Sequence, residues 1–166
     1  MNNVKYESEL YEPMAQWLKQ KLQAEYKNHD AEVFAIDCHA DYLDNVLEKH
    51  DVLQHFPQTV GLQIKIDVLG IVKLPSLAEL VFIEAKKMSL RLSHLGQLWA
   101  YCKLCDPKEA YLLSSCDLGS LEKIFKNLRR EDLLDFGDGN VIKKMQIAKW
   151  DVSKDSIDYQ TLIPKL

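Results

Sequence analysis

Three charged residues, Asp67, Glu84 and Lys86, have the types and the spacing that metal-assisted chemistry needs. In a β-strand, side chains at positions i and i+2 point to the same face, so Glu84 and Lys86 share one face. Two opposite charges therefore end an otherwise apolar strand face. Asp67 lies in the preceding expected strand, and antiparallel pairing across the turn at Pro75 would bring it near Glu84.

These side chains suit a divalent cation and a phosphodiester. Two neighbouring carboxylates repel each other unless a cation lies between them. Hard oxygen ligands suit Mg²⁺ or Mn²⁺, and such an ion lowers the pKa of a coordinated water and stabilises charge on a scissile phosphate. Lys86 is placed to orient or deprotonate that water, or to bind the phosphate. Together the residues form a complete set for metal-assisted phosphodiester hydrolysis.

Asp67 followed by Glu84-Ala85-Lys86 at a strand end resembles the PD-(D/E)XK superfamily of restriction-endonuclease-like nucleases. The resemblance implies that Asp67, Glu84 and the backbone carbonyl of Ala85 bind the metal. It implies that Lys86 assists the attacking water. It also implies an α/β fold with a restriction-endonuclease-like core (αβββαβ), a mixed β-sheet flanked by helices. Ile66 stands where many members have proline, a position that varies within the family.

Gln97 and Tyr101 match the Q-x-x-x-Y pattern of the RecB-like members of that superfamily. They are i, i+4 neighbours on one helix face. The resemblance implies that they support the site and contact DNA, and His94 lies on the same stripe. Taken alone, both would be ordinary helix residues, with Tyr101 buried and its hydroxyl bonded. Their place just after Glu84-x-Lys86 favours the functional interpretation.

The N-terminal helix offers a further ligand, because family members often place a glutamate there that reaches the metal. Glu7, Glu9 and Glu12 are the candidates. Glu7 shares the expected buried face of Leu10 and Met14, so it is the first candidate and Glu9 is the second.

The formal net charge is -4, which is not the charge of a protein that coats nucleic acid. Phosphate contacts must therefore come from a local site. By position, Lys87 and Arg91 are the best candidates, with a solvated charged surface as the alternative for each. We expect DNA as the partner, without a membrane, and a homodimer would be in keeping with small family members that pair to cut two strands.

The remaining metal-binding residue types favour ordinary roles. Cys102 and Cys105, with Cys38 and Cys116, resemble an iron–sulfur set, but the first two lie on the Q-x-x-x-Y helix and are better explained as core residues. Zinc is disfavoured for the same reason. The spacing of a second set of possible ligands matches no known metal site, so we interpret them as solvated loop side chains. They are Asp37, His39, Asp41, His50 and His55.

The chain as a whole has the composition of one globular domain, residues 1–166. It has 166 residues, of which 47% are hydrophobic and 28% charged, enough for a core without disulfides or a structural metal. The N-terminal segment lacks the apolar core of a signal peptide. No run approaches the ~18 apolar residues of a membrane span. The expectation is a cytoplasmic protein with reduced cysteines.

Hydrophobic periodicity predicts the elements that position these residues. A helix is expected over 4–27, with its regular part starting near Tyr11 because Pro13 is tolerated in a first turn. Another helix should begin at Ser89 as its N-cap and run to 104. Further helices are expected over 40–50 and 118–134, and strands over 32–37, 62–72, 79–86, 109–114 and 141–152, the last at a sheet edge. This order predicts a mixed-sheet α/β domain.

Two functions follow. The first is a small Mg²⁺-dependent (or Mn²⁺-dependent) nuclease that acts on DNA. The alternative is a catalytically inactive member of the same fold that serves as a binding or assembly module. The acidic net charge and the lack of a separate DNA-binding domain favour the alternative, and the retention of every motif residue favours the enzyme.

Overall fold

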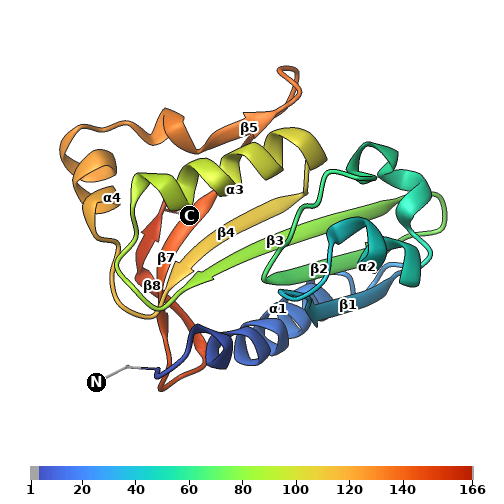
Figure 1. Ribbon diagram of the computed structural model, residues 1–166, viewed down its shortest axis with the longest axis horizontal. Helices are drawn as coiled ribbons and strands as arrows, with labels where there is room; N and C mark the ends of the chain where they lie inside the picture. The colour runs from blue at the N-terminus through green and yellow to red at the C-terminus, as the bar shows by residue number, and fades with distance from the viewer. Residues whose placement is uncertain (1–3, 166) are drawn as a thin grey trace.

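The computed structural model describes residues 4–165 and shows an α/β domain with a mixed six-stranded sheet flanked by helices (Figure 1). The strands follow the order β1-β2-β3-β4-β7-β8 across the sheet. β1, β2 and β3 form an antiparallel meander, β4 and β7 continue in parallel to β3, and β8 returns antiparallel to β7. Their bounds are β1 Glu32–Asp37, β2 Val68–Lys73, β3 Ala78–Lys86, β4 Glu109–Ser114, β7 Gln146–Asp151 and β8 Ser156–Ile163.

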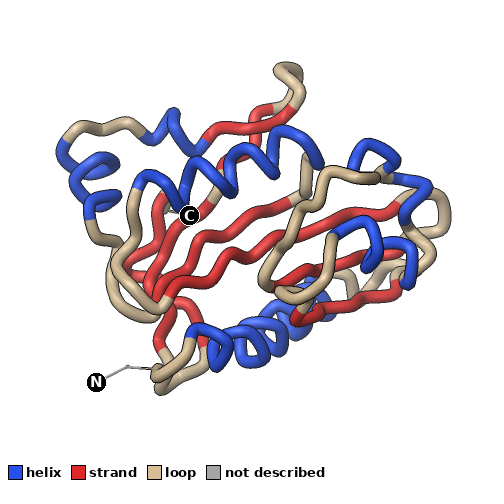
Figure 2. Tube along the Cα trace, viewed as in Figure 1, coloured by secondary structure: helices blue, strands red, loops and turns tan. Residues whose placement is uncertain are grey.

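Two longer helices cover opposite faces of this sheet, α1 (Tyr11–Glu25) and α3 (Leu92–Cys105), as Figure 2 shows. Shorter elements surround them, and β5 pairs with β6 in a small separate hairpin. The shorter elements are η1 Glu7–Leu10, α2 Leu43–Lys49, η2 Leu53–His55, η3 Pro57–Thr59, α4 Ser120–Glu122, η4 Lys123–Asn127, η5 Glu131–Leu134, β5 Asp135–Gly137 and β6 Ile142–Lys144.

The sheet separates two hydrophobic clusters, because alternate strand residues face opposite layers. The α1 layer holds Leu18, Ile83 and Trp150, and the α3 layer holds Phe82 and Leu98, all of them fully buried. Fully burying one such leucine stabilises the fold by about 1.5–3 kcal/mol. Every residue of β3 from Leu80 to Ala85 is buried, so the position of its last residues is fixed from both sides.

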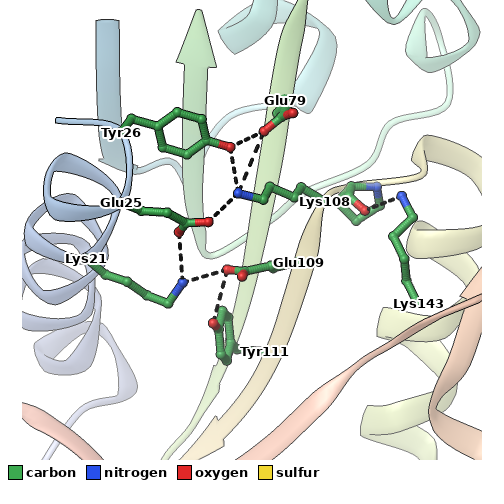
Figure 3. Close-up of polar contacts among 9 residues, drawn as sticks. Lys21, Glu25, Tyr26, Glu79, Lys108, Glu109, Tyr111 and Lys143 are labelled. Atoms are coloured by element: carbon green, nitrogen blue, oxygen red, sulfur yellow. Dashed lines mark hydrogen bonds and ion pairs between the residues drawn. The ribbon is translucent and has the colours of Figure 1, made fainter. Parts of the chain in front are cut away.

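A network of ion pairs closes the end of the sheet where β3 begins (Figure 3). Lys108 contacts Glu25, Tyr26 and Glu79, with its Nζ 2.6 Å from the Tyr26 hydroxyl and 3.9 Å from Glu79 Oε2. Lys21 adds a 2.9 Å ion pair to Glu109 at the start of β4. The network joins the end of α1 to two central strands. It lies at the opposite end of β3 from Glu84 and Lys86.

Most of the expected elements are confirmed, including the regular helix from Tyr11 and the strand over 32–37. The expected strand over 62–72 was wrong in its first half, because β2 begins only at Val68. Residues before it are held by single backbone bonds instead: Leu43 N–H donates to the Ile64 carbonyl at 2.8 Å and Cys38 N–H to the Asp67 carbonyl at 3.1 Å. Ser89 is not the N-cap of α3, which begins at Leu92.

The C-terminal third departs furthest from expectation. The helix expected over 118–134 is broken into α4, a π-helical turn and η5, because Arg129 takes a left-handed φ of 54°. The strand expected over 141–152 is divided into β6 and β7. β7 is not an edge strand, because β8 pairs with its outer side.

The described residues include no helix with the length and apolar character needed to cross a membrane. Cys102 and Cys105 lie on α3 and are buried in the core, as predicted, whereas Cys116 is exposed. Cys38 is also buried.

Candidate metal and phosphate site

The candidate site lies where β3 ends and β2 begins, beside the start of η1. Figure 1 shows the end of β3, the N-terminal helix and the start of α3 at one end of the molecule. The register ends with Val68 opposite Ile83, and Asp67, the residue before Val68, contacts the end of β3 through its side chain. Cross-strand partners share a face. Leu80 and Phe82 belong to the α3 layer, so alternation directs Glu84 to that side.

Asp67 is half-buried and bonds to the backbone of β3. Its Oδ2 accepts a hydrogen bond from the Ala85 N–H at 2.9 Å. Burial raises the pKa of the Asp67 carboxyl above its usual range, although the Ala85 N–H and the charge of Lys86 act in the opposite direction. A residue within a strand directs its N–H and its C=O to the same neighbour. The Ala85 carbonyl therefore points to the side of Asp67.

Glu84 is a buried carboxyl with an unused oxygen. Its side chain is only 4% exposed, and Oε1 has no hydrogen-bond partner within residues 4–165. Burial, followed by the charge of Asp67, raises the pKa of Glu84 well above its usual range. Burying an unpaired carboxylate is costly unless it is protonated or finds a positive partner. A cation held between Asp67 and Glu84 would remove both penalties.

Lys86 is half-exposed and follows Glu84 on the same strand face. Its carbonyl accepts the Ser115 N–H at 3.0 Å, which fixes the end of β3 against the chain after β4. None of the described carboxylates forms an ion pair with its ammonium group. The charge of Lys86 nevertheless opposes the effect of burial on both Asp67 and Glu84. This ammonium group is therefore free to bind an anion near the two carboxyls.

Glu7 and Glu9 occupy different positions. Glu7 Oε2 accepts the Lys87 N–H at 3.1 Å, so its carboxylate lies at the end of β3. Glu9 Oε2 instead accepts the Tyr6 N–H at 2.6 Å and caps η1. The structure thus brings Glu7, and not Glu9, to the candidate site.

Of the three candidate residues on α3, His94, Gln97 and Tyr101, only His94 is brought near Lys86. His94 Nδ1 accepts the Arg91 N–H at 3.1 Å, and burial followed by the charge of Lys86 lowers the pKa of His94. Gln97 Nε2 donates to the Tyr101 hydroxyl at 3.2 Å. In the described chain neither Gln97 nor Tyr101 forms a hydrogen bond with Asp67 or Glu84.

The chain matches no family model, no curated protein and no solved structure. The geometry of the site must therefore carry the functional argument. Among the residues that the structure describes, no group of three His, Cys, Asp or Glu side chains is arranged as a metal site. The site offers instead two carboxylates and one carbonyl, all hard oxygen donors of the kind that Mg²⁺ and Mn²⁺ accept beside water.

The other candidate ligands do not form a metal site either. Asp41 forms an ion pair with Lys49 at 2.8 Å, and the His50 ring packs on Phe34 with centroids 4.8 Å apart. Asp37 Oδ1 lies 2.5 Å from His39 Nδ1.

Tyr11 and Cys38 border the site and were missed in the sequence. Tyr11 is buried, and burial followed by the charges of Asp67 and Glu7 raises the pKa of its hydroxyl. Cys38 donates from its backbone N–H to the Asp67 carbonyl and from Sγ to the Ile66 carbonyl, both at 3.1 Å. Tyr11 follows Glu7 by one helical turn, a spacing that would have identified it. Nothing in the sequence around Cys38 indicated its contact with Asp67.

Proposed function

We propose that this protein is a divalent-metal-dependent nuclease that hydrolyses phosphodiester bonds in DNA. The observation that carries the proposal is the buried Glu84 Oε1 without a partner, next to the carboxyl of Asp67. Burying the two carboxyls side by side is costly while both are ionised, and a bound cation removes that cost. Mg²⁺ or Mn²⁺ is the partner that their chemistry suits.

The proposed roles follow from position. Asp67, Glu84 and the Ala85 carbonyl would hold the cation, which when bound supplies Lewis-acid stabilisation of the scissile phosphate. Lys86, a cation without a carboxylate partner among the described residues, lies on the same strand face and would orient the attacking water or bind the phosphate. Glu7, at the end of β3, would assist from the helix side.

The outer contacts would come from α3 and the segment before it. Lys87, Arg91 and His94 surround the start of α3, where their donors would bind phosphates adjacent to the cleaved one. Gln97 and Tyr101 would support this surface through their mutual hydrogen bond.

The arrangement of the elements supports a restriction-endonuclease-like core. Apart from α2, η2 and η3, which are inserted between β1 and β2, the order α1, β1, β2, β3, α3 and β4 follows the αβββαβ order that the motif implies. Glu84, Ala85 and Lys86 then occupy the end of the third meander strand, and Asp67 directly precedes the second.

Calorimetric titration with Mn²⁺ tests the proposal. The wild type should bind the ion, and Asp67→Asn, which keeps an acceptor for the Ala85 N–H, should weaken binding at least about tenfold because one charged ligand is lost. Asp30→Asn, an exposed aspartate remote from β3, serves as the matched control. Equal affinity for the wild type and Asp67→Asn, or no binding at all, would overturn the proposal.

One observation favours the alternative, a catalytically inactive binding or assembly module. Among the described residues, no third His, Cys, Asp or Glu side chain is arranged with Asp67 and Glu84 as a metal site. A module of this kind would bind its partner equally well with and without Mn²⁺. Loss of Mn²⁺ binding in Asp67→Asn would exclude it as the sole function of the site.

A further inference from the structure

Five exposed side chains form a group beside the candidate site. We name it the Tyr6 ridge; it consists of Lys5, Tyr6, Lys87, Met88 and Arg91. Lys5 Nζ lies 5.2 Å from the centroid of the Tyr6 ring, and Lys87 Nζ donates to the Lys5 carbonyl at 3.2 Å. An Arg91 guanidinium nitrogen lies 3.6 Å from Met88 Sδ. These contacts join two segments that are far apart in the sequence.

The ridge is attached to the candidate site through the backbone. Glu7 accepts a hydrogen bond from the N–H of Lys87, the residue after Lys86. Glu7 is itself the residue after Tyr6. A strand of nucleic acid lying on the ridge would therefore run beside Lys86 and the two carboxyls. The start of η1 and the end of β3 are held together here, so the ridge has a defined shape.

The ridge is positively charged in a protein whose formal net charge is -4. In the part of the chain that the structure describes, Lys5, Lys87 and Arg91 form no ion pair with a carboxylate. Near Lys5 in the sequence, Glu9 has its carboxylate engaged with the Tyr6 N–H. Three cations without carboxylate partners on one surface attract a polyanion.

Tyr6 determines which polyanion fits. Its side chain is 58% exposed, so its ring lies at the surface beside Lys5 instead of packing into the core. Exposed aromatic rings alternating with cations bind single-stranded nucleic acid, because unpaired bases stack on the ring while the cations hold the backbone. A duplex keeps its bases stacked inside and offers no base face to such a ring. Anionic membranes and phosphopeptides would use the charge without needing the ring.

We infer that the Tyr6 ridge binds a single-stranded segment of the nucleic-acid substrate, with one base on Tyr6 and the backbone on Lys5, Lys87 and Arg91. The inference rests on the proposed function for the statement that this strand is the one cleaved. It makes the substrate single-stranded, or a duplex with an unpaired end, at the point where it enters the site.

Fluorescence anisotropy in EDTA tests the inference without cleavage. The probes are an oligothymidine of about 20 nucleotides, longer than a single-strand site of ~4–16 nucleotides, an abasic strand of equal length and a duplex of equal length. Tyr6→Ala should weaken oligothymidine binding about tenfold, within the range for loss of one stacked base. Tyr6→Phe should bind as the wild type does. Tyr159→Ala, which removes another tyrosine of similar exposure (53%), should have no effect.

Binding of the abasic strand should be weaker in the wild type and unchanged by Tyr6→Ala. Equal affinity of the wild type and Tyr6→Ala for oligothymidine would overturn the inference. A preference for the duplex would do the same, as would failure to bind oligothymidine while vesicles of phosphatidylserine are bound. Because Asp67 and Glu84 play no part in this assay, its failure is distinct from a failure to bind Mn²⁺, which would overturn the proposed function alone.

Discussion

Replacing Glu84 with glutamine should stabilise the cation-free protein. The Glu84 carboxyl is buried, and burial followed by the charge of Asp67 raises its pKa well above its usual range. At pH values between the ordinary glutamate pKa and the raised pKa of Glu84, the native state keeps a proton that the unfolded chain has released. The free energy of unfolding therefore falls as the pH rises through this window. Glutamine keeps the shape of the side chain and removes the charge.

The size of the effect follows from the burial. Each pH unit within the window costs about 1.4 kcal/mol, and glutamine removes this charge-dependent cost while leaving a polar group in the same place. We expect Glu84→Gln to raise the free energy of unfolding at neutral pH by roughly 1–3 kcal/mol. For a domain of this size that is about 2–4 °C in Tm for each kcal/mol. The gain should vanish below the ordinary glutamate pKa of about 4.3, where the carboxyl is protonated in both states.

The assay is urea and thermal unfolding in EDTA from about pH 4 to about pH 8. Glu122→Gln, an exposed glutamate paired with Lys126, is the matched control and should change stability little. Mn²⁺ should then stabilise the wild type, by about 2.7 kcal/mol at a hundred times its Kd, and stabilise Glu84→Gln less. The reasoning fails if Glu84→Gln is less stable than the wild type at neutral pH, or if its gain does not change with pH.

Two further predictions concern the fold. Gly70→Ala should lower the free energy of unfolding by about 1–3 kcal/mol, because a Cβ there would lie 2.9 Å from Leu18 Cδ2 and 3.1 Å from Val81 Cβ. In chemical denaturation, Gly96→Ala, with nothing within 4 Å of its Cβ, should be neutral or stabilising, and equal effects would contradict the packing argument. Lys108→Met should cost about 1–2 kcal/mol, because it leaves Glu25 and Glu79 without their shared cation. The exposed control Lys154→Met should cost almost nothing, and a neutral Lys108→Met would show that the network contributes no stability.

The central part of the fold follows from local sequence, and the C-terminal part does not. β3 and β4 are apolar runs whose burial depends little on context, and α1 begins where Pro13 requires it. β8 was missed because its identity as a strand depends on pairing with β7, a long-range contact with no local sign. The break at Arg129 was likewise invisible, because arginine has no preference for a left-handed φ.

In the candidate site too, some features follow from local sequence and others depend on long-range packing. The period of two along β3 and one hairpin sufficed to place Asp67 beside the end of β3. Sequence spacing could not show that Glu84 is buried with an unused oxygen, since burial depends on the packing of both layers. Sequence spacing could distinguish Glu7 from Glu9 only by assuming an α-helix of about 3.6 residues per turn. The segment η1 that contains both is a 3₁₀ helix, in which residues point in different directions than in an α-helix.

Cleavage of a labelled oligonucleotide with Mg²⁺ or Mn²⁺ is the most direct test of the central claim, that Asp67, Glu84 and Lys86 form one hydrolytic site. The account predicts metal-dependent cleavage by the wild type and by the exposed-lysine control Lys154→Ala. It predicts that Lys86→Ala lowers the rate by about 10²–10⁴-fold with an unchanged Tm. Cleavage by Lys86→Ala at the wild-type rate, or no cleavage by a folded wild type that binds Mn²⁺, would contradict it.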